Sequence, residues 1–211
     1  MTDDLTIPSA ATDETLLAAF VNGDRTAFAP LVKRYERELF QFIYRFLGNA
    51  AAADDVFQET FIQVYTSAKT FDLTKRFRPW LFTIAANKAR DQLRSRARRQ
   101  TVPLQANIGA TLSGGSTGEG REFIDLLESP DVGPIEQLQD KELSERVNAA
   151  IQRLPDKLRE VLILAYFNKF PYRDIAEMLN LPLGTVKSRL HAALEAFGQI
   201  WKSKNWRTSA S

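Results

Sequence analysis

A segment rich in glycine, serine and proline interrupts this chain between Gln100 and Ile135, and it limits what the chain can fold into. Such a composition is typical of a flexible linker, because it offers little apolar surface to bury. A short apolar run from Phe123 to Leu127 is the exception, and it could dock on a partner. The sequence therefore predicts two folded domains rather than one. The expected divisions are a disordered N-terminus (1–11), a first domain (12–99), a flexible linker (100–135), a second domain (136–201) and a polar tail (202–211).

On both sides of this linker, apolar residues recur every three or four positions, which is the spacing of an amphipathic helix. The first domain is predicted to contain helices over 12–23, 26–47, 51–68 and 78–99. Helical spacing returns at Glu136, and Pro155 opens a further helix. Since no stretch alternates like a β-strand, the predicted fold class is all-α, with two small helical domains.

Composition excludes several classes of protein. The 211 residues carry a net charge of only +2, so any affinity for nucleic acid must come from local clustering. With no cysteine and a single histidine, the sequence gives no pattern for a catalytic, metal or cofactor site. The N-terminus lacks the basic start and apolar core of a signal peptide, and no run of about twenty apolar residues could span a membrane. We expect a cytoplasmic protein without membrane insertion and without enzymatic activity.

The stretch from Tyr172 to Phe197 predicts two short helices joined by a tight turn. Pro182 suits the first position of the second helix, where its missing N–H is not needed. The second helix would bury an apolar face and leave its polar residues outside, as in a helix-turn-helix that reads the DNA major groove. The expected buried residues are Val186, Leu190, Ala193, Leu194 and Phe197. An ordinary helical hairpin with a solvated polar face is the alternative.

The helix from Arg78 to Arg99 has an apolar arc and, opposite it, a polar and cationic stripe. The stripe is predicted to consist of Trp80, Thr83, Asn87, Arg90, Arg94 and Arg98. An aromatic ring, an amide and several guanidinium groups can together stack on a base, bond to its edge and neutralise phosphates. This combination favours nucleic-acid binding over the alternative, a solvated helix face with a basic tail.

Four stretches in this order resemble a bacterial sigma factor of the extracytoplasmic-function (ECF) group. They are DDVFQETFIQVY (54–65), FRPWLFTIAANKARDQLR (77–94), LPDKLREVLIL (154–164) and YRDIAEMLNLPLGTVKSRLHAALEAF (172–197). The resemblance covers both predicted domains, which would correspond to sigma regions 2 and 4. It implies a non-catalytic subunit that gives core RNA polymerase its promoter specificity.

The resemblance also implies roles for individual residues. A helix face that docks on the largest-subunit clamp helices would comprise Asp54, Asp55, Gln58, Glu59 and Gln63. A loop and basic helix that capture the melted −10 element would comprise Phe71, Asp72, Leu73, Thr74, Lys75, Arg76, Trp80, Asn87, Arg90 and Arg94. A reader helix for the −35 element would comprise Pro182, Gly184, Thr185, Lys187, Ser188, Arg189 and His191. The loop is unusually basic and lacks glycine, so the resemblance transfers no base preference.

The implied partners are core polymerase, through its clamp helices and flap, promoter DNA in double-stranded and melted form, and an anti-sigma protein. No cofactor is implied. A stand-alone DNA-binding regulator is the second hypothesis, in which the N-terminal helices sense a signal or dimerise. The acidic docking face and the basic helix with Trp80 argue against it. The sequence leaves open whether the two domains pack together when the chain is free.

Overall fold

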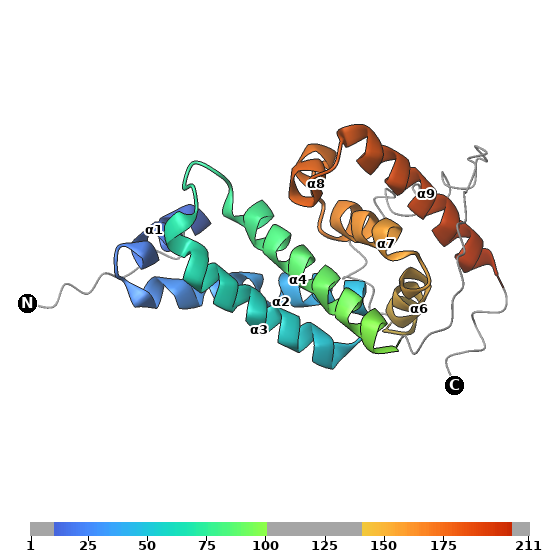
Figure 1. Cartoon of the computed structure of the whole chain (residues 1–211), viewed down its shortest axis with the longest axis horizontal. Helices are drawn as coiled ribbons and strands as arrows, with labels where there is room; N and C mark the ends of the chain where they lie inside the picture. Colours follow the sequence, from blue (N-terminus) through green and yellow to red (C-terminus); the bar gives the residue numbers. More distant parts are fainter. Residues whose placement is uncertain (1–10, 101–140, 204–211) are drawn as a thin grey trace, which may run out of the picture.

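The computed structural model describes residues 11–100 and 141–203 (Figure 1). Its N-terminal half contains α1 (Asp13–Val21), the short 3-10 helix η1 (Arg25–Ala27), α2 (Phe28–Leu47), α3 (Ala50–Ser67), the 3-10 helix η2 (Ala68–Thr70) and α4 (Phe77–Gln100). Its C-terminal half contains α6 (Lys141–Gln152), α7 (Asp156–Leu162), the π-helical turn η4 (Ile163–Phe167), α8 (Tyr172–Leu179) and α9 (Leu183–Lys202). The two described ranges hold no β-strand, and the predicted all-α class is confirmed.

Parts of the sequence prediction fall outside these ranges. The linker beyond Gln100, the apolar run 123–127, the start of the second domain at 136–140, the N-terminus before Ala11 and the tail after Ser203 all lie outside the described residues. Within the described ranges, no helix combines the length and apolar character needed to cross a membrane.

Local chemistry sets the helix ends. The Thr12 side chain accepts a hydrogen bond from Thr15 N at 3.2 Å and so caps α1. Gly48 adopts φ 68° and ends α2. Immediately after it, the Asn49 side chain caps α3 by accepting from Ala52 N at 2.9 Å. The sharp reversal between α2 and α3 therefore rests on two adjacent residues.

The position predicted for Pro182 is wrong by one residue. Pro182 is the N-cap of α9, with φ −60° and ψ 142°, and the helix begins at Leu183. The Pro182 carbonyl accepts the first helical hydrogen bonds, from Thr185 N at 2.9 Å and Val186 N at 3.2 Å. The turn before it depends on Asn180, which adopts a left-handed φ of 51° at the end of α8.

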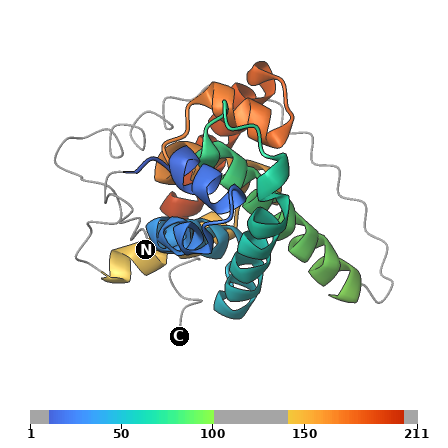
Figure 2. The same ribbon diagram turned by 90° about the vertical axis from the view of Figure 1, so that its left-hand side faces the viewer.

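The two halves pack against each other around one continuous apolar core. In Figure 1, α1 to α4 lie on the left, α6 to α9 lie on the right, and α4 lies between α3 and the C-terminal helices. Helix α4 contacts α8, while α2 contacts α6 and η4. Figure 2 shows the molecule from its left-hand side, with α8 beside the loop that precedes α4. The sequence left open whether the two domains pack together when the chain is free, and the structure shows that they do.

Aromatic rings fill the boundary between the halves. Phe82 of α4 is fully buried, with its ring centroid 5.3 Å from that of Phe42 in α2 and 5.0 Å from that of Phe170 in the C-terminal half. The Arg78 guanidinium lies 4.1 Å from the Phe170 ring centroid and donates to the Asn168 carbonyl at 2.7 Å. Arg78 also forms an ion pair with Glu38 of α2. Apolar and polar contacts thus coincide at this boundary.

The end of α2 is capped by side chains from the other half. The last carbonyls of a helix have no partner within the helix. Arg159 of α7 donates to the Phe46 carbonyl at 2.8 Å, and Gln152 of α6 donates to the Arg45 carbonyl. Because these bonds connect residues more than a hundred positions apart, no local sequence pattern predicts them.

Candidate nucleic-acid interface

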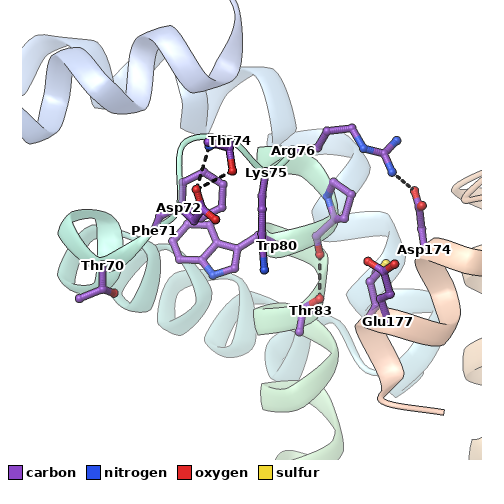
Figure 3. Close-up of a pocket in the computed structure, with 12 residues that line it drawn as sticks. Thr70, Phe71, Asp72, Thr74, Lys75, Arg76, Trp80, Thr83, Asp174 and Glu177 are labelled. Carbon is purple, nitrogen blue, oxygen red and sulfur yellow. Dashed lines mark hydrogen bonds and ion pairs between the residues drawn. The ribbon is translucent and has the colours of Figure 1, made fainter.

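A cavity of about 520 Å³ lies between the loop 71–76, the start of α4 and helix α8. Figure 3 shows the residues around it. From the N-terminal half it is lined by Thr70, Phe71, Asp72, Thr74, Lys75, Arg76, Pro79, Trp80 and Thr83, and from the C-terminal half by Asp174, Glu177 and Met178. Six of these residues were predicted as −10 element contacts. Leu73, another predicted contact, does not line the cavity and is 45 % exposed.

The loop is held in shape by Asp72. Its Oδ1 atom accepts from Thr74 N at 3.0 Å and from the Thr74 hydroxyl at 2.7 Å, and its carbonyl accepts from Lys75 N at 2.9 Å. The hydrogen bonds from Thr74 lower the pKa of the Asp72 carboxyl below its ordinary value. An Asx turn of this kind gives a rigid bend without glycine, and it leaves Lys75 and Arg76 exposed.

An aromatic group forms the floor beside this loop. The Trp80 ring lies 4.5 Å from the Phe71 ring and 5.8 Å from the buried Phe77 ring, measured between centroids. Phe77 is further fixed because its backbone N–H donates to Glu14 of α1 at 2.8 Å. Trp80 is half-buried and lines the cavity, so one part of its ring is supported while another can meet a ligand. A supported ring is a suitable stacking surface for a nucleobase.

The remaining stripe residues on α4 differ in their surroundings. Asn87 is exposed and accepts from Arg90 Nη2 at 2.8 Å. Arg94 is 69 % exposed and pairs only loosely with Asp91 at 3.2 Å. Arg90 instead turns toward the C-terminal half, where its Nε atom lies 3.1 Å from Glu160 Oε1. The stripe predicted from the sequence is therefore exposed over only part of its length.

Glu160 of α7 is a buried carboxyl between cations from two other helices. Its side chain is 6 % exposed, and its Oε1 atom lies 3.1 Å from Arg90 Nε of α4. The charges of Arg189 on α9 and of Asp156 on its own helix also act on it. Burial raises the pKa of Glu160 to about 7, and the two arginines oppose that rise. The carboxyl thus takes up a proton near neutral pH in the folded chain.

Glu160→Gln is expected to flatten the pH dependence of stability. The pKa of Glu160 rises from 4.5 to about 7 on folding, so its stabilising contribution is complete below pH 4.5 and is lost as pH rises to 7. Relative to the variant, the unmodified chain should lose about 3 kcal/mol of unfolding free energy between pH 4.5 and pH 8. Urea denaturation at both pH values measures this difference. The exposed Glu36→Gln provides the control, and equal pH slopes in all three proteins would contradict the expectation.

Helix α9 presents its predicted polar face. Its buried residues are Val186, Leu190, Ala193, Leu194 and Phe197, as predicted from the helical spacing. The exposed residues on the other side are Gly184, Lys187, Ser188 and His191, together with Pro182 at the cap. The half-buried ones are Thr185 and Arg189. The Ser188 hydroxyl donates to the Thr185 carbonyl at 3.1 Å, and the His191 Nε2 atom lies 3.7 Å from Glu195 Oε1. Lys187 therefore stands out as an exposed cation near the start of the helix.

The residues predicted to dock on polymerase share one exposed face of α3. All five are exposed: Asp54, Asp55, Gln58, Glu59 and Gln63. Two large apolar residues of this helix are also exposed, Ile62 at 63 % and Tyr65 at 48 %. They border an apolar groove that Phe28 and Val32 of α2 complete. The face is thus both acidic and apolar, which suits a protein partner.

Sequence reasoning missed the residues that connect the halves. Arg159 and Glu160 are buried although their neighbours Leu158, Val161 and Leu162 alone carry the helical pattern. Asp174 pairs with Arg76 at 2.7 Å, and the two are 98 positions apart in sequence. Four of the seven residues of α7 are charged, so the sequence of this helix gives no local signal that Arg159 and Glu160 are the buried ones.

Comparisons with known proteins agree with this arrangement. Family models for Sigma-70 region 2 and Sigma-70 region 4 match residues 31–99 and 144–197. The ECF RNA polymerase sigma factor SigW of Bacillus subtilis is 36% identical over 174 residues, which cover 82% of this chain and 88% of SigW. The RNA polymerase sigma-H factor of Pseudomonas aeruginosa is 36% identical over 184 residues, covering 87% of this chain and 91% of that factor.

Solved structures share the fold. CnrH, solved in complex with the cytosolic domain of CnrY, aligns with a TM-score of 0.64 at 24% identity, over 92% of this chain and 99% of CnrH. The sigma factor RpoE of Bartonella quintana, solved with the anti-sigma factor NepR, aligns with a TM-score of 0.58 at 22% identity, over 84% of this chain and 98% of RpoE.

Proposed function

Because the chain belongs to the ECF group of RNA polymerase sigma factors, we propose that it binds core polymerase and directs it to promoters by reading two DNA elements. The helices of the N-terminal half bind the −10 element, and α9 binds the −35 element. The observation that carries this proposal is the cavity in which the supported Trp80 ring meets the exposed cations Lys75 and Arg76. We propose no catalytic role and no cofactor.

In the −10 element, a base from the opened strand enters the cavity and stacks on Trp80. Extruding a base from the duplex costs a few kcal/mol of unstacking, so a binding pocket must offset that cost. Phe71 backs the Trp80 ring, Lys75 and Arg76 neutralise phosphates beside the cavity, and Asn87 and Arg94 continue the contact along α4. The rigid turn at Asp72 supports the proposal, because a preformed loop loses little entropy on binding.

In the −35 element, α9 enters the major groove with its N-terminal end. Lys187 is exposed there and can donate to guanine O6 and N7, while Ser188 and His191 extend the contact along the same face. Gly184 is exposed at the start of the helix, and because glycine carries no Cβ, its backbone can approach DNA closely. Arg189 is half-buried on the same helix, and we propose that it contacts a phosphate.

Core polymerase is the proposed partner of the acidic face on α3, through the clamp helices, and of the C-terminal half, through the flap. An anti-sigma protein is a further proposed partner, since a protein with this fold, RpoE of Bartonella quintana, has been solved with the anti-sigma factor NepR. Run-off transcription with purified core polymerase tests the function as a whole. A transcript that requires both the chain and a promoter is expected. Tight DNA binding by the chain without any transcript would favour the stand-alone regulator instead.

Reversing two charges on α3 is expected to weaken binding to core polymerase. Asp54→Lys/Asp55→Lys changes exposed side chains and should leave the fold intact, while association falls about tenfold because complementary charge is lost. A pull-down of core polymerase at increasing salt measures this change. Glu36→Lys/Asp91→Lys, which reverses two exposed acids elsewhere, is the matched control. Equal association of both double variants would mean that the acidic face is merely solvated.

A further inference from the structure

Helix α1 lies against both ends of the loop 71–76, because it contacts η2 just before the loop and α4 just after it (Figure 1). Two adjacent acids in the first turn of α1 bind other elements. Asp13 accepts a hydrogen bond from the Tyr35 hydroxyl of α2. Glu14 Oε1 accepts from the backbone N–H of Phe77, the first residue of α4, at 2.8 Å. One turn of α1 therefore connects the start of α4 to α2.

The start of α4 has no capping side chain directly before it. The first N–H groups of a helix lack a partner within the helix, and a preceding Ser, Thr, Asp or Asn commonly accepts from them. The residue before α4 is Arg76, whose guanidinium can only donate. Phe77 is fully buried, so its N–H needs an acceptor from the protein. Glu14 supplies that acceptor from 63 positions away, and its negative charge suits the N-terminal end of a helix.

The Phe77 ring supports the aromatic group beside the cavity. Its centroid lies 5.8 Å from that of Trp80 and 6.3 Å from that of Phe71. Trp80 lies in the same first turn of α4, so a shift of that turn would move the Phe77 and Trp80 rings together. The Tyr35 ring also packs on Phe77, at 5.7 Å between centroids, and its hydroxyl is the group that Asp13 binds. The two acids of α1 thus fix Phe77 through its backbone and through its ring.

We infer that Glu14 is a positioning residue for the −10 element, because its bond to the Phe77 N–H holds the start of α4 and, through it, the Trp80 ring that receives a base. This inference rests on the proposed function. Glu14 acts without touching DNA. A stacking surface that is already fixed loses less entropy on binding than a mobile one, so the bond adds to affinity for the opened strand.

Two conservative variants separate this hydrogen bond from the charge of Glu14. Glu14→Gln keeps an acceptor oxygen at the same reach and removes the charge. Glu14→Asp keeps the charge in the first turn of α1, but its side chain is one methylene shorter and does not reach the Phe77 N–H. A role in charge alone predicts normal DNA binding by the aspartate variant and tighter binding by the glutamine variant, since an acid near an anionic ligand is removed. Positioning predicts weaker binding by the aspartate variant and normal binding by the glutamine variant.

The first test measures binding of the −10 element by the complex of the full chain with core polymerase. The probe is a fluorescein-labelled single strand that carries the non-template −10 element of a promoter transcribed by this complex, followed by fluorescence anisotropy. Glu14→Asp should bind it about fivefold more weakly than the unmodified chain, and Glu14→Gln should stay within about twofold.

The matched control for charge is Glu36→Gln, which removes an exposed acid of α2 and should also stay within about twofold. Association with core polymerase and binding of duplex DNA with the −35 element should be the same in all four proteins, which checks that the fold is intact. Equal affinity of Glu14→Asp and the unmodified chain for the single strand would overturn the inference.

The second test observes the Trp80 ring without DNA. The chain contains three tryptophans, so Trp201→Phe/Trp206→Phe leaves Trp80 as the only one. In this background Glu14→Asp should raise acrylamide quenching of Trp80 fluorescence about twofold, because a ring that is less firmly held is exposed more often. Glu14→Gln should leave the quenching unchanged. Equal quenching in both variants and their parent would overturn the inference and leave the proposed function intact, whereas absence of a transcript with the unmodified chain would count against the proposed function itself.

Discussion

Replacing Arg159 by leucine is expected to lower the free energy of unfolding by about 3 kcal/mol. The guanidinium donates to three carbonyls, those of Phe46 at 2.8 Å, Gln152 at 2.9 Å and Leu154 at 2.9 Å. The Arg159 side chain is only 8 % exposed, so water cannot readily replace these donors. Leucine would fill part of the volume but leave the carbonyls without partners, and each such buried acceptor costs about 1–3 kcal/mol.

Urea denaturation followed by far-ultraviolet circular dichroism measures this loss. Arg153→Leu, which changes an exposed arginine nearby, should alter stability by less than about 0.5 kcal/mol. The loss of stability in Arg159→Lys should lie between those of Arg159→Leu and Arg153→Leu, because an ammonium carries the charge but cannot span the same set of acceptors. An equal free energy of unfolding for Arg159→Leu and the unmodified chain would contradict this prediction. It would mean that the cost of burying the guanidinium equals the gain from its hydrogen bonds.

Lys187→Ala is expected to reduce affinity for double-stranded DNA carrying the −35 element by about 10- to 100-fold, which corresponds to about 1–3 kcal/mol for one good base contact. Lys187 is exposed at the start of α9 and forms no part of the buried face of the helix. The change should therefore leave the fold and core binding intact. Promoter binding by the complex with core polymerase, at fixed salt, measures the effect.

The matched control for this experiment is Lys157→Ala, which removes an exposed lysine from α7 in the same half of the chain. It should weaken binding slightly and independently of DNA sequence, as the loss of a distant charge does. The assignment of the α9 face to the −35 element would be abandoned if Lys187→Ala impaired core association as much as promoter binding.

The elements that the sequence predicts well are those with local causes. The five buried residues of α9 follow from a spacing of three and four positions, and the ends of α1 and α2 follow from Thr12 and Gly48. The shift of Pro182 from the first helical position to the cap has a local cause too. The Pro182 carbonyl accepts the first helical hydrogen bonds, which makes Pro182 the N-cap. A sequence pattern does not distinguish the N-cap from the first helical position, because the two are adjacent.

Part of the cavity lining was predictable from the sequence, but the surroundings of the cavity were not. Its aromatic and cationic residues fall in or beside one short loop, and the sequence alone brings Phe71, Lys75, Arg76 and Trp80 together. That Asp174 and Glu177 close the same cavity depends on a contact between α4 and α8. The exposure of Ile62 and Tyr65 similarly depends on which face of α3 the neighbouring helices cover.

The sequence by itself determined the helices, their amphipathic faces, the family and the residue types of both proposed DNA surfaces, because these rest on spacings of a few residues and on short motifs. Only the tertiary structure decided that the two halves share one core, that Arg159 caps α2, and that Glu160 and Asp174 pair with arginines of the proposed −10 surface. Those contacts join positions 70 to 113 residues apart, or more than one helix at once. Their partners are selected by packing in three dimensions, where burial makes a charge costly unless an opposite charge or a donor meets it.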